Sequence, residues 1–311
     1  MYKGRRVAVV VPAFNEERFI GGVLSTMPAF VDRIVVVDDG SGDATGRVAA
    51  SVEDPRVKVL RSDRNRGVGA AMRLGYGAAL EDGAELIAKM DGDGQMPPEY
   101  LSRLLDALTD EHYDYAKGNR FLLVDSLKTM PRVRLVGNMG LTFMTKLASG
   151  YWHVFDPQNG FTAIRAECLR RLDLDAIYDG YFFENDMLIQ LSLRDFRVKD
   201  VPVPARYGDE VSGLKPLAVG LRFPHLLTRR FFGRIVLKYV LRDFSPIALF
   251  LFLGLALFGW GTLFGVYLWI TSNVTGHATP TGTIMLALLP LILGFLLLLQ
   301  AIVLDIQESK K

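Results

Sequence analysis

Two carboxylates stand one residue apart in the segment KMDGDGQMPPEYL, residues 89–101. Asp91 and Asp93 follow an apolar run and precede a pair of prolines, so we expect them at the end of a strand. Carboxylates on one tight turn can hold Mg²⁺ or Mn²⁺, whose other ligands are water and substrate phosphate oxygens. A plain turn is the alternative, because Asp and Gly suit turns and a Pro pair can begin a helix.

The surrounding elements favour the functional interpretation. Strand-like apolar runs at 7–11, 34–37, 57–60 and 86–90 alternate with stretches of helical spacing such as 17–27 and 69–80. This alternation predicts an α/β fold with a mainly parallel sheet, in which ligands bind where strands end. The polar motifs VPAFNEE, VDDGSGDAT, DRNRGVGAA and MDGDGQ follow the four runs in turn.

Composition excludes some functions. The 36 basic and 34 acidic residues nearly balance, so we expect no nucleic-acid partner. Cys168 is the single cysteine of the chain, which excludes an intrachain disulfide and a Cys-rich metal site.

The C-terminal part differs sharply from the rest of the chain. Residues 244–304 contain no Lys, Arg, Asp or Glu, and the apolar stretches 246–270 and 283–304 each exceed the roughly 20 residues that cross a bilayer core. We therefore predict two membrane spans, with a pair of buried core helices as the alternative. The predicted division is 1–215, 216–245 and 246–311: a catalytic domain, a juxtamembrane segment, and two spans with a short tail.

The basic residues predict the orientation of the spans. Lys310 and Lys311 follow the second span, whereas the loop between the spans has no Lys or Arg, so the positive-inside rule places the catalytic domain and the C-terminus in the cytoplasm. Six more basic residues precede the first span: Arg222, Arg229, Arg230, Arg234, Lys238 and Arg242. Four of them recur at i+4 beside an apolar face, which predicts interfacial helices with basic side chains at lipid headgroups. A solvated basic face is the alternative.

The motifs VPAFNEE, VDDGSGDAT, DGDGQ and END resemble, in this order, those of family-2 glycosyltransferases with the GT-A fold. The basic segment and the two spans resemble more narrowly the polyprenyl-phosphate glycosyltransferases, the group that includes dolichyl-phosphate mannose synthase. The resemblance covers about residues 5–215 by motif and extends to the C-terminus by architecture.

The resemblance implies a donor site for a nucleotide sugar. It assigns the nucleoside side of the pocket to Pro12, Ala13, Phe14 and Glu16, and the base or ribose to Asp38 and Asp39. It assigns the metal and the diphosphate to Asp91, Asp93 and Gln95, with Asp91 also a candidate to face the ribose. Asn15 and Asp43 have turn and capping roles as the competing interpretation, so we leave them out of the site.

The resemblance also implies an acceptor site. In KGNRF, Arg120 is placed near the acceptor phosphate, and Arg134 is the expected second arginine; guanidinium groups suit phosphate because they bind it bidentately. Asn119 and Asn138 stand where the family often has Ser, and Asn138 can still donate a hydrogen bond to the lipid phosphate. A closing loop resembling Arg-x-x-Gly-x-Ser-Lys adds three phosphate contacts, although extra residues separate the last two: Arg206, Ser212 and Lys215.

The reaction implied is the inverting transfer of a hexose from a UDP- or GDP-sugar to polyprenyl or dolichyl phosphate. FDPQNGFTAIR resembles the segment that lines the sugar pocket, and FFENDMLIQL holds the acidic motif beside the acceptor nucleophile. Asp93, Asp186 and Arg120 are the predicted catalytic residues. For Glu184 and Asp186, the alternative is acidic charge at a helix N-terminus.

Three other functions compete with this one. A processive polysaccharide synthase generally carries Gln-x-x-Arg-Trp, and no Trp of this chain follows an Arg. A membrane-anchored transferase with another lipid or a protein acceptor is the nearer alternative. A non-catalytic, membrane-tethered nucleotide-sugar binder belongs to a different class. The sequence leaves open the donor nucleotide and the sugar. It also leaves open the oligomeric state, because the apolar helices could pack between copies of the chain.

Overall fold

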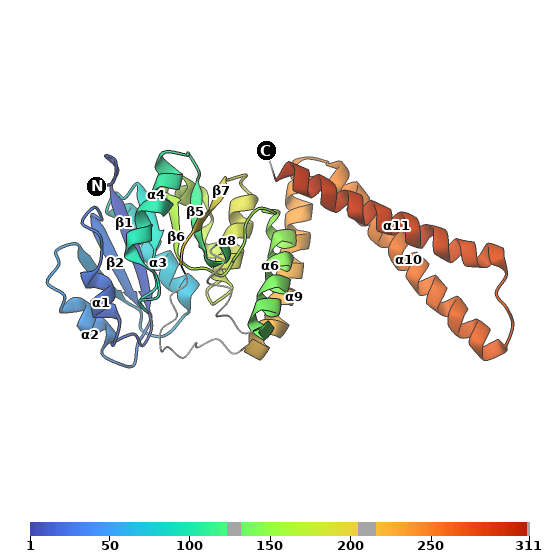
Figure 1. The fold of residues 1–311 in the computed structure, drawn as a ribbon, viewed down its shortest axis with the longest axis horizontal. Helices are drawn as coiled ribbons and strands as arrows, with labels where there is room; N and C mark the ends of the chain where they lie inside the picture. The colour runs from blue at the N-terminus through green and yellow to red at the C-terminus, as the bar shows by residue number, and fades with distance from the viewer. Residues whose placement is uncertain (123–131, 205–215, 310–311) are drawn as a thin grey trace. The chain divides into compact units, whose positions relative to one another are not determined.

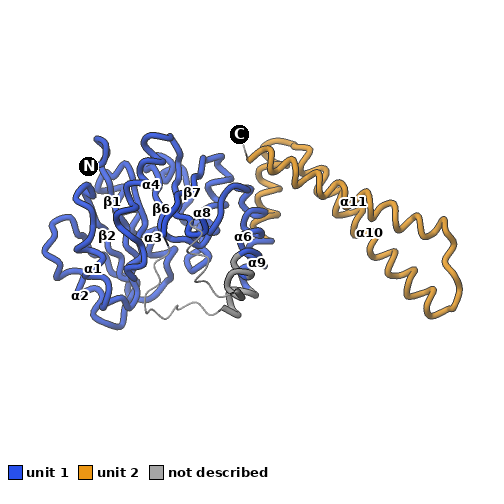
Figure 2. The backbone as a smooth tube through the Cα atoms, viewed as in Figure 1, with its two compact units in different colours: residues 1–228 blue, residues 229–311 orange. Residues whose placement is uncertain are grey.

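The computed structural model describes residues 1–122, 132–204 and 216–309, and it describes the backbone alone for 132–136, 138 and 216–221. The chain forms two compact units, Met1–Thr228 and Arg229–Lys311 (Figure 2). The first unit is an α/β domain, and the second consists mainly of two long helices.

One sheet of seven strands forms the centre of the first unit in the described residues (Figure 1). Its order is β3-β2-β1-β4-β6-β5-β7, and within the described sheet only β6 runs antiparallel to its neighbours. The mainly parallel sheet predicted from the sequence is thus confirmed. The strands are β1 (Val7–Ala13), β2 (Arg33–Asp38), β3 (Val57–Arg61), β4 (Leu86–Lys89), β5 (Tyr115–Asn119), β6 (Thr162–Arg165) and β7 (Val198–Pro202).

Helices cover both faces of the sheet, so its central strands are apolar on both sides. In β1, Val7, Val9 and Val11 belong to one core cluster, while Ala8 and Val10 belong to the other. The first cluster includes residues of α1 (Ile20–Ser25), α2 (Thr45–Ala50) and α4 (Leu101–Thr109), and the second includes residues of α3 (Val68–Glu81), α7 (Ala166–Arg171) and α8 (Phe183–Ser192). α6 (Arg132–Ser149) packs on α8, where the Thr145 hydroxyl donates to Asn185 Oδ1 at 2.9 Å. The 3₁₀ turns are η1 (Pro98–Tyr100), η2 (Arg120–Leu122) and η3 (Leu174–Ala176).

The helix predicted over 69–80 is confirmed as α3, whereas the one predicted over 17–27 is shorter than expected. The amides of Phe19 and Ile20 both donate to the Glu16 carbonyl, so the chain turns before α1 begins. The missing turn leaves residues 14–19 as a loop at the end of β1.

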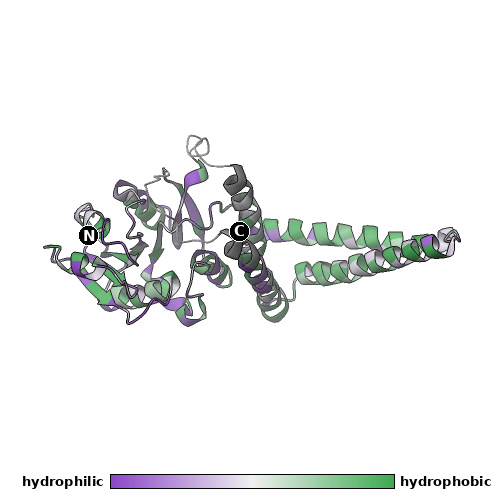
Figure 3. Ribbon diagram, turned by 90° about the horizontal axis from the view of Figure 1, so that it is seen from below, coloured by the Kyte–Doolittle hydropathy of each residue, from purple (hydrophilic) through white to green (hydrophobic). Residues whose placement is uncertain are grey.

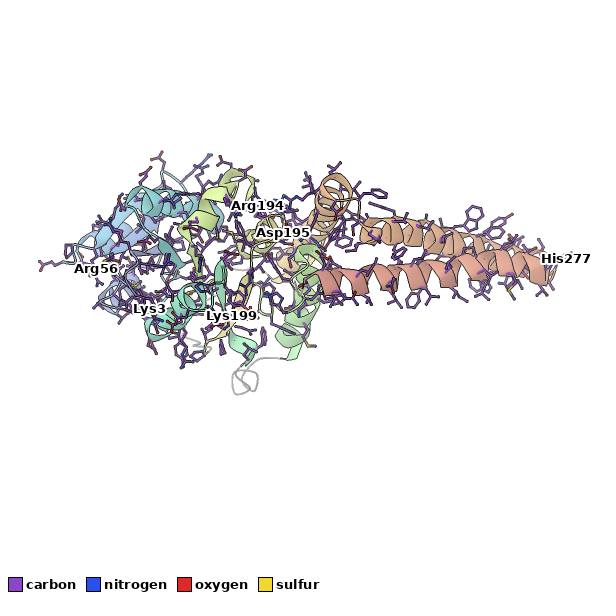
Figure 4. The ribbon with its side chains drawn as sticks, turned by 90° about the horizontal axis from the view of Figure 1, so that it is seen from above. Lys3, Arg56, Arg194, Asp195, Lys199 and His277 are labelled. Carbon is purple, nitrogen blue, oxygen red and sulfur yellow. The ribbon has the colours of Figure 1, made fainter. Side chains whose placement is uncertain are left out.

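The second unit holds two helices long and apolar enough to cross a membrane, α10 (Pro246–Thr275) and α11 (Thr281–Glu308). Figure 3 colours their many hydrophobic residues green, and Figure 4 labels His277 in the loop that joins them. Small residues let their backbones approach closely: a Cβ added at Gly261 would lie 2.6 Å from the Leu291 backbone nitrogen. Both predicted apolar stretches are therefore helical, and each helix is longer than predicted.

The basic segment before α10 is helical, as α9 (Pro216–Val236) followed by a π-helical stretch, η4 (Leu237–Arg242). Arg234 is 1% exposed and binds Asp305 of α11 bidentately, at 2.8 and 3.0 Å, and the Tyr239 hydroxyl donates to Asp305 at 2.7 Å. The prediction that this basic side chain reaches lipid headgroups is wrong for Arg234, because its charge is neutralised inside the second unit.

Candidate active site

The loops after β1, β2 and β4 meet at one edge of the sheet because these strands are parallel neighbours. In the register, Ala13 pairs with Asp38, and Val10 pairs with Lys89. Three of the polar motifs found in the sequence are therefore brought together, as the strand-end argument predicts.

Hydrogen bonds tie the loop after β1 to the loop after β2. Asn15 has a φ of 58°, its amide donates to Ser41 Oγ, and its side-chain oxygen accepts from the Gly42 amide at 2.9 Å. Asp43 accepts from the backbone of Thr45 and Glu17. Both residues thus have turn and capping roles. Within the same loop the structure places Pro12 and Ala13 inside the domain, Phe14 42% exposed and Glu16 half-buried.

Asp38 and Asp39 are both buried and shape the same edge. Asp38 accepts from the Ser41 amide at 2.9 Å and lies 3.5 Å from the Arg61 guanidinium. Asp39 accepts from the amides of Arg66 and Gly67, so it fixes the turn that leads into α3. Their roles toward base or ribose stay predictions.

The turn after β4 carries the paired carboxylates. The Gly92 amide donates to the Pro12 carbonyl at 3.3 Å, which holds this turn against the end of β1. Asp93 Oδ1 accepts from the Gln95 amide at 2.9 Å, and Gly94 takes a φ of 75°, a conformation that favours glycine. These hydrogen bonds shape the turn and hold it beside the β1 loop.

A pocket opens beside this turn, with about 470 Å³ of empty space including the part open to solvent. Asp91, Asp93 and Gln95 line it together with Arg120 and residues 158–161. The structure therefore brings the predicted metal and diphosphate residues to the same pocket as the predicted acceptor arginine. Gln158, Asn159 and Gly160 come from the FDPQNGFTAIR segment, whose role in lining a sugar pocket stays a prediction.

A buried aspartate that the sequence reasoning missed holds Arg120 in place. Asp156 is 3% exposed and accepts from Arg120 Nε at 2.7 Å, from Nη2 at 2.8 Å, and from the Arg120 amide at 3.2 Å. Burial alone would raise the pKa of Asp156, but the hydrogen bonds and charge of Arg120 outweigh burial and lower it. Asp156 also has a φ of 50°, unusual outside glycine, as found where a site constrains the backbone.

A buried lysine links the paired aspartates to the acidic motif of α8. Lys89 is 1% exposed, and its Nζ lies 2.5 Å from Asp91 Oδ1 and 3.2 Å from Glu184 Oε1. Burial opposes its charge, but Asp91 and Glu184 raise the pKa of Lys89 above its usual value, so it stays protonated. A Cβ on Gly160 would collide with Lys89 Nζ and lie 2.8 Å from Asp91 Oδ2. The sequence holds a signal for this role, because Lys89 is a charged residue inside an otherwise apolar strand, and such residues are rarely buried without a partner.

Asp186 lies away from the pocket lining in the described residues. Its side chain is fully buried, and Oδ2 accepts from the Tyr178 amide at 2.9 Å. The neighbouring Asp179 carbonyl accepts from the Gly69 amide of α3. Asp186 therefore anchors the loop that lies against the start of α3, and its catalytic role stays a prediction.

The remaining predicted acceptor residues cannot be placed around the pocket. Arg206, Ser212 and Lys215 lie outside the described residues, and Arg134 and Asn138 are described by their backbone in α6 only.

The donor set suits Mg²⁺ or Mn²⁺. No group of three or more His, Cys, Asp or Glu side chains that could hold a metal occurs in the described ranges. Asp91 and Asp93 nevertheless offer two carboxylates at one pocket, beside the Gln95 side chain. These cations are commonly held by one or two carboxylates plus phosphate oxygens and water, so the residues fit a cation that binds together with a diphosphate.

Residues 8–173, which run from β1 through the paired aspartates to the end of α7, match the family described as Glycosyl transferase family 2. The chain belongs to glycosyl transferase family 2. The predicted family is thus confirmed, and the protein is a glycosyltransferase.

This family 2 glycosyltransferase has relatives in archaea and bacteria. It is 37% identical over 65% of its length to an uncharacterized protein of Methanocaldococcus jannaschii, of which 82% is covered. It is 34% identical over 64% of its length to the polyprenol monophosphomannose synthase of Mycolicibacterium smegmatis, of which 77% is covered. It is 29% identical over 65% of its length to the UDP-N-acetylglucosamine–dolichyl-phosphate N-acetylglucosaminyltransferase of Methanococcus voltae, of which 86% is covered.

Solved structures support the GT-A fold of this family 2 glycosyltransferase. The glucosyl-3-phosphoglycerate synthase of Mycobacterium tuberculosis matches with a TM-score of 0.56 at 21% identity, over 75% of this chain and 82% of that one. The same enzyme in complex with Mn²⁺, UDP and phosphoglyceric acid matches with a TM-score of 0.56 at 20% identity, over 74% of this chain and 78% of that one.

Proposed function

We propose that this glycosyltransferase moves a hexose from a nucleotide sugar to polyprenyl or dolichyl phosphate, with inversion at the anomeric carbon. The observation that carries the proposal is a single pocket lined by Asp91, Asp93 and the clamped Arg120. Such a pocket has carboxylates for a cation with its diphosphate and a guanidinium for a second phosphate. The acceptors in the names of the relatives from M. smegmatis and M. voltae support the lipid phosphate.

The donor side is assigned to the β1, β2 and β4 loops. Asp91, Asp93 and Gln95 would hold Mg²⁺ or Mn²⁺ with the diphosphate, and the cation would supply neutralisation of charge on the leaving group. Phe14 and the backbone around it would face the nucleoside, because that loop is bonded to the Gly92 turn through Pro12. Glu16, Ala13, Asp38 and Asp39 complete this side.

The acceptor side is assigned to Arg120, with Arg134, Asn138, Arg206, Ser212 and Lys215 as further phosphate contacts. The Asp156 carboxylate occupies Nε and Nη2 of Arg120. This fixes the plane of the guanidinium, so Arg120 would meet an incoming phosphate in one orientation.

The transfer needs positioning more than deprotonation. A phosphate monoester has a second pKa of about 6, so a lipid phosphate is largely dianionic at neutral pH and can attack directly. One of its oxygens forms the bond to the anomeric carbon as the bond to the diphosphate oxygen breaks, and the electron pair leaves with the nucleoside diphosphate. Arg120 holds the nucleophile, and Asp186 acts through the loop that it anchors.

A lipid acceptor implies that the enzyme works at a membrane. α10 and α11 support this, because both are long and apolar enough to cross a bilayer. We place the first unit and the C-terminus on the cytoplasmic side. Basic residues flank the two helices, whereas the loop between them has neither Lys nor Arg.

A donor and acceptor panel tests the proposal. Purified protein in lipid vesicles is incubated with UDP- and GDP-hexoses, with Mn²⁺ or Mg²⁺, and with either polyprenyl phosphate or the matching neutral polyprenol. We expect one nucleotide sugar to be used, only with the phosphate and only with a cation. Transfer to the neutral alcohol or to a protein would favour the alternative acceptors, and donor binding without any transfer would favour a non-catalytic binder.

A further inference from the structure

A polar network lies inside the domain on strands β5 and β7, next to Arg120. Lys117 of β5 pairs with Asp200 of β7 in the parallel register, and Asn119 lies two residues further along β5, so the three side chains are on one face of the sheet. Lys117 and Asn119 are buried, and the Asp200 side chain is 10% exposed. We name these three residues the β5–β7 network. The pocket described above has none of them in its lining.

On one side, the network holds the backbone that carries Arg120. The Asn119 side chain donates through Nδ2 to Asp200 Oδ2 at 2.6 Å. Its Oδ1 accepts from the Phe121 amide at 2.9 Å. Asn119 and Phe121 are the two neighbours of Arg120 in the chain, so a single side chain brackets the arginine and ties it to β7.

On the other side, the network holds the backbone that carries Asp156. The Phe155 amide donates to Asp200 Oδ2 at 2.7 Å, and the Phe155 carbonyl accepts from Lys117 Nζ at 2.8 Å. Both polar backbone groups of Phe155 are therefore fixed directly before Asp156, whose φ is 50°. A non-glycine residue keeps such a conformation only where its surroundings impose it.

These polar residues are not needed merely to hold two strands together. Lys117 Nζ lies 3.9 Å from Asp200 Oδ1, a long separation for an ion pair. Burial lowers the pKa of Lys117 and raises the pKa of Asp200, so a charge on either side chain is costly at this position. Apolar side chains of similar volume are often as stable in place of a buried pair. What the polar side chains add is directed hydrogen bonds, and these end beside the two residues of the clamp.

We propose that Lys117, Asn119 and Asp200 are positioning residues, which hold the backbones of Arg120 and Asp156 in fixed register and so set the orientation in which the arginine meets an acceptor phosphate. The part of the proposal that concerns the phosphate rests on the proposed function. The holding of the two backbone segments does not, and the two parts are tested separately.

Amide hydrogen exchange of the full chain in detergent micelles tests the holding of the backbone. Lys117→Met combined with Asp200→Leu replaces the pair by apolar side chains, and we call this protein the apolar-pair variant. Asp114→Asn is the matched control, because it changes a carboxylate that bonds β5 to β7 at the opposite end of the strands. We expect peptides covering residues 119–122 and 155–161 to exchange at least about tenfold faster in the apolar-pair variant alone. Unchanged exchange in these peptides would overturn the proposal.

Activity tests the effect on the acceptor. The apolar-pair variant should lower kcat/KM for polyprenyl phosphate at least about tenfold, with the donor KM nearly unchanged. In an Arg120→Ala background the same two substitutions should cause no further loss, because the network acts through that arginine. A loss of equal size in both backgrounds, or an equal rise in the donor KM, would overturn the positioning role.

A second variant covers the case in which the apolar-pair variant does not fold. Asn119→Leu keeps the approximate size of the side chain and leaves the contacts of Lys117 and Asp200 with Phe155 in place. It should cause the same loss on the acceptor side, and a normal kcat/KM in the folded Asn119→Leu protein would contradict the proposal. If the unmodified protein transfers no sugar to polyprenyl phosphate, the proposed function fails, while hydrogen exchange still decides whether the network holds the clamp.

Discussion

Asp156→Asn tests whether Arg120 works only because a buried carboxylate holds it. Asparagine keeps the size of the side chain but loses the charge, and its NH₂ group is a donor facing a donor guanidinium. The pair joins a 3% exposed carboxylate to a 25% exposed arginine. Removing one partner of a buried pair costs roughly 3 to 5 kcal/mol, and the partial exposure of Arg120 favours the lower end, about 3 kcal/mol of unfolding free energy.

The catalytic consequence should appear on the acceptor side. A charged hydrogen bond contributes about 1.5 to 3 kcal/mol, so a misplaced Arg120 should lower kcat/KM for polyprenyl phosphate at least about tenfold, with the donor KM nearly unchanged. A double-mutant cycle measures this with Arg120→Ala, Asp156→Asn and both together. The double variant should be no slower than Arg120→Ala, because Asp156 acts through the arginine. Losses that multiply would refute the reasoning. Asp114→Asn is the control. It removes a carboxylate that accepts from the Arg197 amide near the start of β5, so any loss of kcat/KM that it causes should multiply with the loss caused by Arg120→Ala.

Acidity gives a second check on the clamp. The pKa of Asp156 is lower in the folded chain than in the unfolded one, so its stabilisation is complete above the unfolded pKa of about 3.9 and is lost as the pH falls through the folded value. The difference in unfolding free energy between the unmodified protein and Asp156→Asn should therefore stay constant from about pH 8 to pH 5 and shrink below about pH 4. Denaturant unfolding at a series of pH values measures it, and a difference already shrinking near neutral pH would contradict the assigned pKa.

Three further predictions concern the donor site and the topology. Asp93→Asn should lower turnover at least about a hundredfold with the fold retained by circular dichroism, and near-normal, still metal-dependent transfer would contradict its role. Gly160→Ala should lower turnover by up to about a hundredfold, because the new methyl group displaces Lys89 and Asp91. Gly77→Ala is the control, since a Cβ there meets open space. Equal activities of the two variants would show that the contact at Gly160 does not matter. A cysteine at Ala278 should react with an impermeant reagent added outside intact cells, and labelling only after lysis would reverse the proposed orientation.

The strand-end loops were predictable because parallel neighbours end at one edge of a sheet. That rule placed Asp91 beside the β1 loop from the sequence alone, and the length of charge-free sequence predicted α10 and α11. The partners of the site residues were not predictable in the same way. Arg120 and Asp156 are 36 residues apart, and Lys89 and Glu184 are still further apart, so only the packing of β5, β4 and α8 joins them.

The i+4 spacing of the basic residues gave a wrong prediction for Arg234, and the reason is physical. A basic residue at i+4 spacing on an amphipathic helix looks alike in sequence whether it faces headgroups or a carboxylate from another helix. The partner of Arg234 is Asp305, which lies 71 residues later in the chain, so the local sequence pattern does not predict the pair.

If α10 and α11 cross the membrane as proposed, that separation orders events during synthesis of the hairpin. While α10 is being inserted, Asp305 has not yet been made, so the charge of Arg234 still counts with its basic neighbours in choosing the side on which they remain. Once α11 has returned across the bilayer, Asp305 reaches the same side and withdraws that charge into a buried pair. A hairpin that failed to return would leave the two charges separated by about 30 Å of hydrocarbon. In the proposed topology, the same arginine would help to set the direction of insertion and would afterwards hold the base of the completed hairpin together.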